Sequence, residues 1–155
     1  MIKYGNKKAI GSFDIRSIFE FVKLFSKEFL QSFVMVNKKT LVIGGSPKPS
    51  RYSNMAIRKL LSYGHTVESI GLKVSQVENV VIQSGKPNYS DIHTVAMYIG
   101  PRHQHDYYKY LLDLKPMRII FNPGTENKEF ATVAAENGIE VIEHCTLVML
   151  NDGLF

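Results

Sequence analysis

The sequence predicts an α/β protein built on a doubly wound, mainly parallel sheet, with an additional amphipathic helix at the N-terminus. Short apolar runs rich in β-branched residues recur along the chain, and helix-length amphipathic stretches separate them. Continuous apolar strands that alternate with helices are typical of a parallel sheet covered on both faces. Right-handed crossovers between such strands give the doubly wound arrangement.

Residues 1–36 differ in character from everything that follows. Apolar side chains recur there at helical spacing from Ile15 to Phe33, and residues 1–36 hold six of the nine phenylalanines. Ser12 can cap the predicted helix, because its hydroxyl can accept a hydrogen bond from a first-turn amide. Three interpretations stay open: a helix that packs on the body, a helix that lies on a membrane or a partner, and an extension that the natural product lacks, with Met35 as the true start.

The body of the chain, residues 37–155, shows the alternation in order. Six runs are predicted as strands: 40–43, 65–70, 80–82, 94–99, 117–121 and 139–142. Helices are predicted at 55–61, from Pro101 through Leu111, and at 130–136. Gly64 and Asn137-Gly138 are expected to end the first and the last of these helices. The order predicts a single Rossmann-like domain.

Composition and charge narrow the class of function. The 155 residues, 45% hydrophobic and 21% charged, suit one globular domain. Residues 1–36 hold six Lys/Arg against three Asp/Glu, and the nearly neutral body has no basic run interleaved with aromatics, which argues against nucleic-acid binding. Cys145 is the only cysteine, so no intramolecular disulfide forms, and no apolar run is long enough to span a bilayer. We expect a cytoplasmic protein.

The loop after the first predicted strand has the composition of an anion site. Ligands of doubly wound sheets bind at the carboxyl ends of the strands. Glycines let the backbone approach a ligand, while serine hydroxyls, free helix amides and cationic side chains suit phosphate oxygens. The candidate residues are Gly44, Gly45, Ser46, Pro47, Lys48, Arg51, Tyr52 and Ser53. The loop matches neither the Walker pattern nor the dinucleotide fingerprint, and a tight turn capped by Ser50 is the structural alternative.

The second predicted strand ends at Gly71 and leads to Lys73, where an NAD site usually presents an acidic residue. A cation at this point favours a ligand with a phosphate on its ribose, which means coenzyme A or NADP. A solvated surface lysine is the alternative, because exposed lysine is the norm.

Two later loops are expected to line the same crevice. Their candidate residues are Gly100, Pro101, Arg102, Asn122, Pro123 and Gly124. Small and turn-forming residues leave room for an extended ligand, but Pro101 and Pro123 equally suit helix starts.

Two rival sites carry less weight. His103 and His105 are two residues apart, which puts them on different faces of a helix, and no third metal ligand is evident. Cys145 beside His144 is expected to be a buried small residue rather than a nucleophile. A mixed disulfide between Cys145 and a thiol ligand is a sharper alternative.

At these residues the sequence resembles the CoA-binding domain family, the small Rossmann-type proteins related to the N-terminal domain of the succinyl-CoA synthetase alpha subunit. The segments that carry the resemblance are VIGGSP at 42–47, RYSN at 51–54, GLK at 71–73, FNPG at 121–124 and EHCTLVML at 143–150. The resemblance implies that the first loop wraps the phosphates of coenzyme A or an acyl-CoA, that residues 71–73 contact its adenosine end, and that the later loops flank the pantetheine arm. In the family the second strand commonly leads into an Asn-Pro-Lys turn, whereas Gly71 and Leu72 precede Lys73 here.

The ligase relatives use additional domains for phosphoryl chemistry, and this chain ends soon after its last predicted strand. We therefore expect a CoA-binding protein that acts as a carrier, a sensor or a partner-dependent subunit. A homodimer and a complex with a partner enzyme are both open as assemblies. We expect no catalytic and no metal-binding residue. Two alternatives stay open: an NADP-dependent oxidoreductase, and an interaction module whose crevice is empty and whose Phe-rich helix is the working surface. A reductase needs a substrate pocket and a proton donor, for which the sequence offers no clear assembly.

Overall fold

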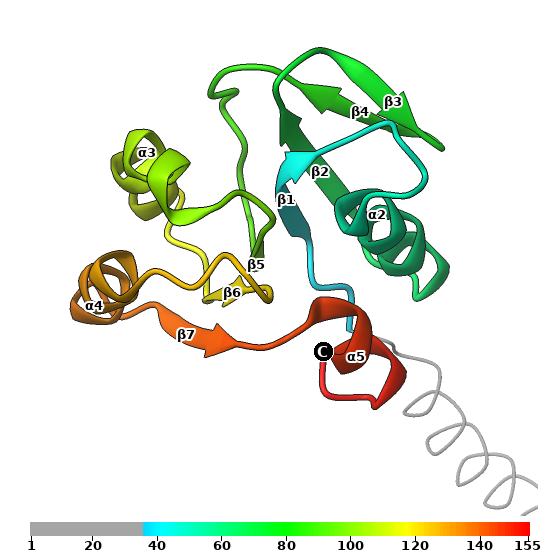
Figure 1. The fold of residues 1–155 in the computed structure, drawn as a ribbon. Helices are drawn as coiled ribbons and strands as arrows, with labels where there is room; N and C mark the ends of the chain where they lie inside the picture. Colours follow the sequence, from blue (N-terminus) through cyan, green and yellow to red (C-terminus); the bar gives the residue numbers. More distant parts are fainter. Residues whose placement is uncertain (1–35) are drawn as a thin grey trace, which may run out of the picture. The chain divides into compact units, whose positions relative to one another are not determined.

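A seven-stranded sheet in the order β3-β4-β2-β1-β5-β6-β7 forms the centre of the described domain (Figure 1). This computed structural model describes residues 36–155, and the amphipathic helix expected near the N-terminus lies outside the described residues. All neighbouring strands pair in parallel except β3 and β4, which are antiparallel. The doubly wound, mainly parallel sheet is therefore confirmed.

The strands and helices follow one another in an α/β order. The strands are β1 Thr40–Gly45, β2 Val67–Gly71, β3 Ser75–Val77, β4 Val80–Gln83, β5 Thr94–Met97, β6 Arg118–Phe121 and β7 Glu140–Glu143. The helices are α2 Tyr52–Ser62, α3 Tyr108–Asp113, α4 Lys128–Glu136 and α5 Thr146–Asn151, and the short 3₁₀ turns are η1 Pro101–His103 and η2 His105–Tyr107. All six predicted strands are present, and β3 and α5 are additional.

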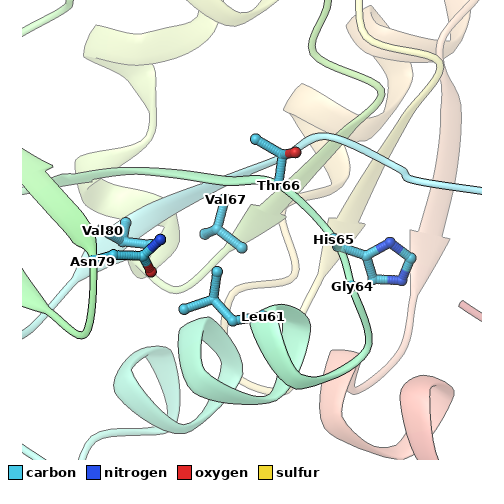
Figure 2. A pocket seen from close by; sticks show the side chains of 7 residues that line it. All are labelled: Leu61, Gly64, His65, Thr66, Val67, Asn79 and Val80. Atoms are coloured by element: carbon cyan, nitrogen blue, oxygen red, sulfur yellow. The ribbon is translucent and has the colours of Figure 1, made fainter.

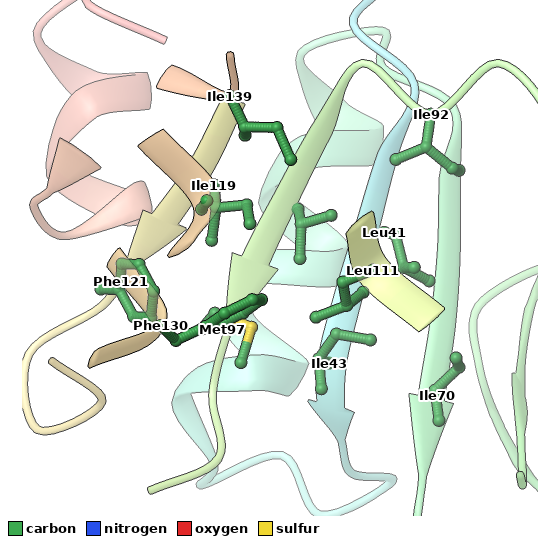
Figure 3. Close-up of a cluster of buried hydrophobic side chains, with 12 residues drawn as sticks. Leu41, Ile43, Ile70, Ile92, Met97, Leu111, Ile119, Phe121, Phe130 and Ile139 are labelled. Atoms are coloured by element: carbon green, nitrogen blue, oxygen red, sulfur yellow. The ribbon is translucent and has the colours of Figure 1, made fainter. Parts of the chain in front are cut away.

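Helices cover both faces of the sheet. Side chains alternate along each strand, so Leu41 and Ile43 point into the core under α3 and α4, while Val42 between them points toward α2 and α5. Figure 3 shows the first of these cores, in which Phe130 of α4 packs edge-to-face on Phe121 of β6 with 5.9 Å between ring centroids. Each fully buried aliphatic or aromatic side chain contributes about 1.5–3 kcal/mol to stability.

The helix predicted from Pro101 through Leu111 is partly wrong. Only Tyr108–Asp113 is α-helical, and the first half consists of the two 3₁₀ turns. The other helix ends agree with the sequence, because α2 ends just before Gly64 and α4 just before Gly138. No helix within residues 36–155 combines the length and apolarity needed to cross a membrane.

The crossover from β2 to β4 contains no helix. The chain turns back through β3, which pairs antiparallel with β4 at the outer edge of the sheet. Only Val77 of β3 is buried, so the strand is held mainly by backbone hydrogen bonds to β4. This hairpin places β4 beside β2 and in parallel with it, which completes one half of the doubly wound sheet.

Candidate functional site

The connections of the sheet diverge between β1 and β5. After β1 the chain leads into α2 and β2 on one side, whereas after β5 it leads into α3 and β6 on the other (Figure 1). Ligands of doubly wound sheets bind outside the carboxyl ends of the strands at this switch point. Every loop that the sequence singled out follows a strand at this edge, so the fold brings the candidate residues to one end of the sheet.

The ends of β1 and β2 require glycine, because a side chain at either position would meet a neighbouring atom. A Cβ on Gly45 would lie 2.1 Å from the Ser69 Oγ, and a Cβ on Gly71 would lie 2.5 Å from the Gly45 carbonyl oxygen. Gly44 has a φ of 96° and lies against the backbone of Tyr98, where β5 ends. The ends of β1, β2 and β5 thus lie close together, and the pairing of β1 with β2 shifts in register between Ile43 and Gly45.

The loop from Ser46 to Arg51 is held by hydrogen bonds from the protein itself. The Lys48 amide donates to the Ser46 hydroxyl at 3.2 Å, and the Arg51 amide donates to the Lys48 carbonyl at 3.0 Å. Asn54, buried in the first turn of α2, donates through Nδ2 to the Ser46 carbonyl at 3.0 Å. These bonds give the loop a defined shape, and Asn54, which the sequence analysis names in the RYSN segment but not among the binding residues, is a supporting residue.

The first turn of α2 presents backbone donors to this loop. Arg51 occupies the position before the helix and no side chain caps it, so the alternative in which Ser50 caps a tight turn is wrong. Uncapped amides at the start of a helix, together with the helix dipole, attract anions. Ser53 lies almost buried in this turn and Tyr52 is exposed.

Four cationic side chains at this edge of the sheet take part in none of the ion pairs found among residues 36–155. They are Lys48, Arg51, Lys73 and Arg102. Lys73 follows β2 in an exposed turn in which Leu72 is fully exposed and the Ser75 hydroxyl donates to the Lys73 carbonyl at 3.3 Å. The edge is thus rich in positive charge without paired carboxylates, as an anionic ligand requires.

A buried glutamine joins the loops that follow β5 and β6. Gln104, fully buried, donates through Nε2 to the carbonyls of Ile99 at 2.9 Å and Thr125 at 2.7 Å. Its Oε1 accepts from Asn127 Nδ2 at 2.9 Å, and Asn127 in turn caps α4 by accepting from the Phe130 amide at 3.1 Å. The Asn127 cap has a sequence signal, since it precedes a helical pattern, but Gln104 stands in a polar stretch and has none.

Asn122 makes a second link at this edge. Its Nδ2 donates to the Met97 carbonyl at 3.1 Å, and its Oδ1 accepts from the Thr146 amide at 2.8 Å, so it joins the end of β5 to the start of α5. Asn122 as a whole is 3% exposed, and the Gly124 amide of this loop donates to the Glu126 carboxylate at 2.8 Å, so the loop is held by the protein's own groups. Gly100 and Gly124 each face open space, where a Cβ would meet no atom within 4 Å.

Tyr98 lies at the end of β5 with its hydroxyl buried. Burial raises the pKa of Tyr98 well above its ordinary value, and the neighbouring Cys145 adds to that rise. The Thr146 side chain beside the Tyr98 hydroxyl opposes part of this rise, although the two hydroxyl groups do not meet in hydrogen-bond geometry. A buried neutral phenol of this kind supplies no proton to a ligand on the outside.

The rival sites receive no support from the geometry. His103 and His105 fall in separate 3₁₀ turns, and residues 36–155 contain no group of three side chains that could hold a metal ion. Cys145 is half-buried before α5, and the Nδ1 of His144 lies 3.3 Å from the Cys145 carbonyl oxygen. Pro101 begins η1 as expected for a helix start, whereas Pro123 lies in a turn.

A hollow of about 340 Å³ lies at the opposite end of the sheet (Figure 2). Its lining residues are Leu61, Gly64, His65, Thr66, Val67, Asn79 and Val80. None of the candidate binding residues is among them, and no lysine or arginine lines the hollow. A hollow without lysine or arginine does not suit a polyphosphate ligand, so the carboxyl edge is the better candidate.

Comparison with known proteins identifies relatives of this chain. The family model described as "CoA binding domain" matches residues 38–151. A crystal structure described only as that of an uncharacterized protein is 44% identical, with a TM-score of 0.76 over 77% of this chain and 99% of that chain. No curated protein matches.

Two more distant structures share the architecture. A hypothetical protein from Pyrococcus horikoshii OT3 is 23% identical, with a TM-score of 0.69 over 82% of this chain and 90% of that chain. A protein from Thermus thermophilus is 20% identical, with a TM-score of 0.68 over 83% of this chain and 98% of that chain. Likeness at this level of identity shows the fold alone.

Proposed function

Because the chain belongs to the CoA-binding domain family, we propose that the loops at the carboxyl edge of its sheet bind coenzyme A or an acyl-CoA, and that the protein is a carrier, a sensor or a partner-dependent subunit. The described residues offer donors and cations at this edge, but no nucleophile paired with a base. The proposed activity is therefore ligand binding, which these donors and cations support.

The diphosphate of the ligand belongs on the loop after β1. Tyr52 and Ser53 offer uncapped helix amides, and Lys48 and Arg51 add unpaired positive charge on the same loop. Because the loop is already held by Asn54, ordering it on binding costs little conformational entropy.

The ribose 3′-phosphate belongs near Lys73. Gly71 pairs with Gly45 across β2 and β1, so the turn that carries Lys73 begins beside the phosphate loop. A ligand whose diphosphate lies on residues 46–53 reaches Lys73 with its adenosine end.

The pantetheine arm belongs along the loops after β5 and β6. The space at Gly100 and Gly124 is open, and the buried Gln104 holds these two loops together. A flexible, largely uncharged arm suits a surface built from glycine and backbone groups.

One observation carries the proposal: the cations on the carboxyl-edge loops have no carboxylate partner within the described part of the chain, although the ion pairs elsewhere bring opposite charges within 4 Å. A ligand with several phosphate groups at this edge would pair with the cations of all these loops at once. Lys73 equally suits the 2′-phosphate of NADP, so the experiment must separate the two ligands.

Calorimetric titration with coenzyme A, 3′-dephospho-CoA, NADP and NAD tests the proposal. We expect coenzyme A to bind most tightly, 3′-dephospho-CoA more weakly, and NADP and NAD least. A preference for NADP would transfer the protein to the oxidoreductases, and an absence of binding by all four ligands would contradict a nucleotide site.

A further inference from the structure

The hydrogen bonds that join the loops after β5 and β6 form a network in which each donor is fixed by its partner. Nε2 of Gln104 lies 2.9 Å from the Ile99 carbonyl oxygen and 2.7 Å from the Thr125 carbonyl oxygen, and both oxygens can only accept. Oε1 of Gln104 is therefore the acceptor end of this side chain. The Phe130 amide donates to Oδ1 of Asn127 at 3.1 Å, which leaves Nδ2 as the donor end of Asn127.

Both protons of the Asn127 side-chain amide also have acceptors. Nδ2 donates to Oε1 of Gln104 at 2.9 Å and to the hydroxyl oxygen of Tyr108 at 2.8 Å. Because an amide nitrogen of this kind only donates, the Tyr108 hydroxyl accepts in this contact and keeps its own proton. None of the hydrogen bonds within residues 36–155 gives that proton an acceptor. The network thus ends in a phenol proton that a further group can accept.

The Tyr108 hydroxyl lies where the loops after β5 and β6 meet. Tyr108 is the first residue of α3, and Asn127 occupies the position before α4, so both belong to helix starts at the carboxyl edge. The Tyr108 ring stacks on Phe130 with 4.2 Å between centroids and 7° between planes, which holds the ring in place.

Burial separates the members of the network. Gln104 is fully buried and Asn127 is 9% exposed, whereas Tyr108 is half-buried. Tyr108 is therefore the member that a ligand can reach, and the other two fix the direction of its hydrogen bond from below.

A phenol proton at this place suits a neutral carbonyl oxygen. The hydrogen bond that the Tyr108 hydroxyl accepts from Asn127 polarises the phenol and strengthens it as a donor. The pantetheine arm of coenzyme A carries amide groups, whose carbonyl oxygens are acceptors without charge. The cations that suit phosphate groups lie elsewhere, on the loops after β1 and β2.

We propose that the Tyr108 hydroxyl donates a hydrogen bond to an amide carbonyl of the pantetheine arm and so determines the preference for coenzyme A over a nucleotide without the arm. The inference rests on the proposed function, because it concerns the same ligand at the same edge of the sheet. It adds the side chain that recognises the uncharged half of that ligand.

Calorimetric titration of the full chain with coenzyme A and with adenosine 3′,5′-bisphosphate, which lacks the arm, tests the contact. Tyr108→Phe keeps the stacked ring and removes only the hydroxyl. We expect this variant to bind coenzyme A about fivefold more weakly, the loss of one neutral hydrogen bond, and to bind the bisphosphate as the wild-type protein does.

Tyr110→Phe is the matched control. Tyr110 belongs to the same helix, but its hydroxyl already donates to the Pro87 carbonyl at 2.7 Å. We expect this variant to bind both ligands with the affinity of the wild-type protein. A loss for coenzyme A as large as that of Tyr108→Phe would contradict a specific role of the Tyr108 hydroxyl.

Carbon NMR separates a direct contact from a loss of support for Asn127. The Cζ resonance of a tyrosine responds to hydrogen bonding of its hydroxyl, and the Tyr108 signal is the one that is missing from the spectrum of Tyr108→Phe. We expect this signal to shift when coenzyme A binds and to stay in place when adenosine 3′,5′-bisphosphate binds.

The outcomes distinguish this contact from the function on which it rests. If the wild-type protein binds coenzyme A, but Tyr108→Phe binds it equally well or weakens both ligands alike, the contact is overturned and the proposed function stands. If the wild-type protein does not bind coenzyme A, the proposed function fails, and the contact fails with it.

Discussion

Gly45 has no room for a side chain, and the main obstacle is a single neighbour, with Ile82 further away at 3.2 Å. The atom that a Cβ would meet, 2.1 Å away, is the Oγ of Ser69, which is buried and donates to the Val42 carbonyl at 3.2 Å. Gly71 is different, because its Cβ would meet a backbone oxygen that no substitution can remove. The end of β1 is therefore fixed by sterics within the protein before any ligand arrives.

We predict that Gly45→Ala lowers the free energy of unfolding by about 1–3 kcal/mol, the usual cost of overpacking. Ser69→Ala in the same chain should restore part of the loss, because it removes the oxygen that the new methyl group meets. Urea denaturation of the two single variants and the double variant measures this coupling. Strictly additive effects would show that Ser69 is not the obstacle.

In the proposed site, Lys73 is the residue that distinguishes a ligand with a phosphorylated ribose from one without that phosphate. We predict that Lys73→Ala weakens coenzyme A binding about tenfold, because one charge-assisted phosphate contact is lost, and leaves the affinity for 3′-dephospho-CoA unchanged. Calorimetry measures both affinities, with Lys109→Ala as the control at an exposed lysine outside these loops. An equal loss for both ligands would show that Lys73 does not contact the 3′-phosphate.

The elements of the fold follow closely from local pattern. All six predicted strands are present, since β-branched apolar runs bounded by glycine leave little choice of structure. β3 and α5 were missed because three and six residues are too short to show a period. The helix prediction after Pro101 was partly wrong for another reason. Gln104 turns inward and donates to the carbonyls of Ile99 and Thr125, and the contact with Thr125 is long-range and has no local sequence signal.

Gln104 supports both of the loops assigned to the pantetheine arm. Gln104→Met keeps the size of the side chain but leaves two carbonyl oxygens and an Asn127 amide proton unpaired. We predict a loss of about 3 kcal/mol in the free energy of unfolding, measured by urea denaturation with the exposed Gln76→Met as control.

The same variant has a consequence for binding. The affinity for coenzyme A should fall more than that for adenosine 3′,5′-bisphosphate, which lacks the arm. If Gln104→Met matches the wild-type protein in both the free energy of unfolding and the affinity for coenzyme A, Gln104 does not support these loops.

At the scale of the whole molecule, two histidines just before β2 and β5, His65 and His93, make stability depend on pH. Burial and neighbouring cations lower the pKa values of His65 and His93 in the folded protein, so the unfolded chain binds more protons below the ordinary histidine pKa. Stability is therefore complete above that pKa and is lost as the pH falls toward the folded values. The slope is at most about 1.4 kcal/mol per pH unit for each histidine, and less for the half-exposed His93.

We predict that the free energy of unfolding in chloride buffers decreases from about pH 7.5 to about pH 5.5. Urea denaturation at several pH values measures the slope, and the double variant His65→Gln, His93→Gln should flatten it. Stability that is constant or rises over this range would contradict the lowered pKa values.

The position of the candidate site could be predicted from the sequence, but its internal support could not. The glycine and lysine patterns mark the loops, and the parallel sheet brings the carboxyl ends of the strands to one edge. Supporting side chains such as Asn54 and Gln104 act through contacts that depend on how the chain folds back on itself. Periodicity along the chain carries no information on such contacts.

The most direct test of the account is an amide NMR titration of the full chain with coenzyme A, because it shows where the ligand binds. The account predicts that the amides of Ser46, Tyr52, Lys73 and Gly100 shift on binding, since they lie on the loops at the carboxyl edge. Shifts confined to Thr66 and Asn79, which line the hollow at the other end of the sheet, would place the ligand there and contradict the account.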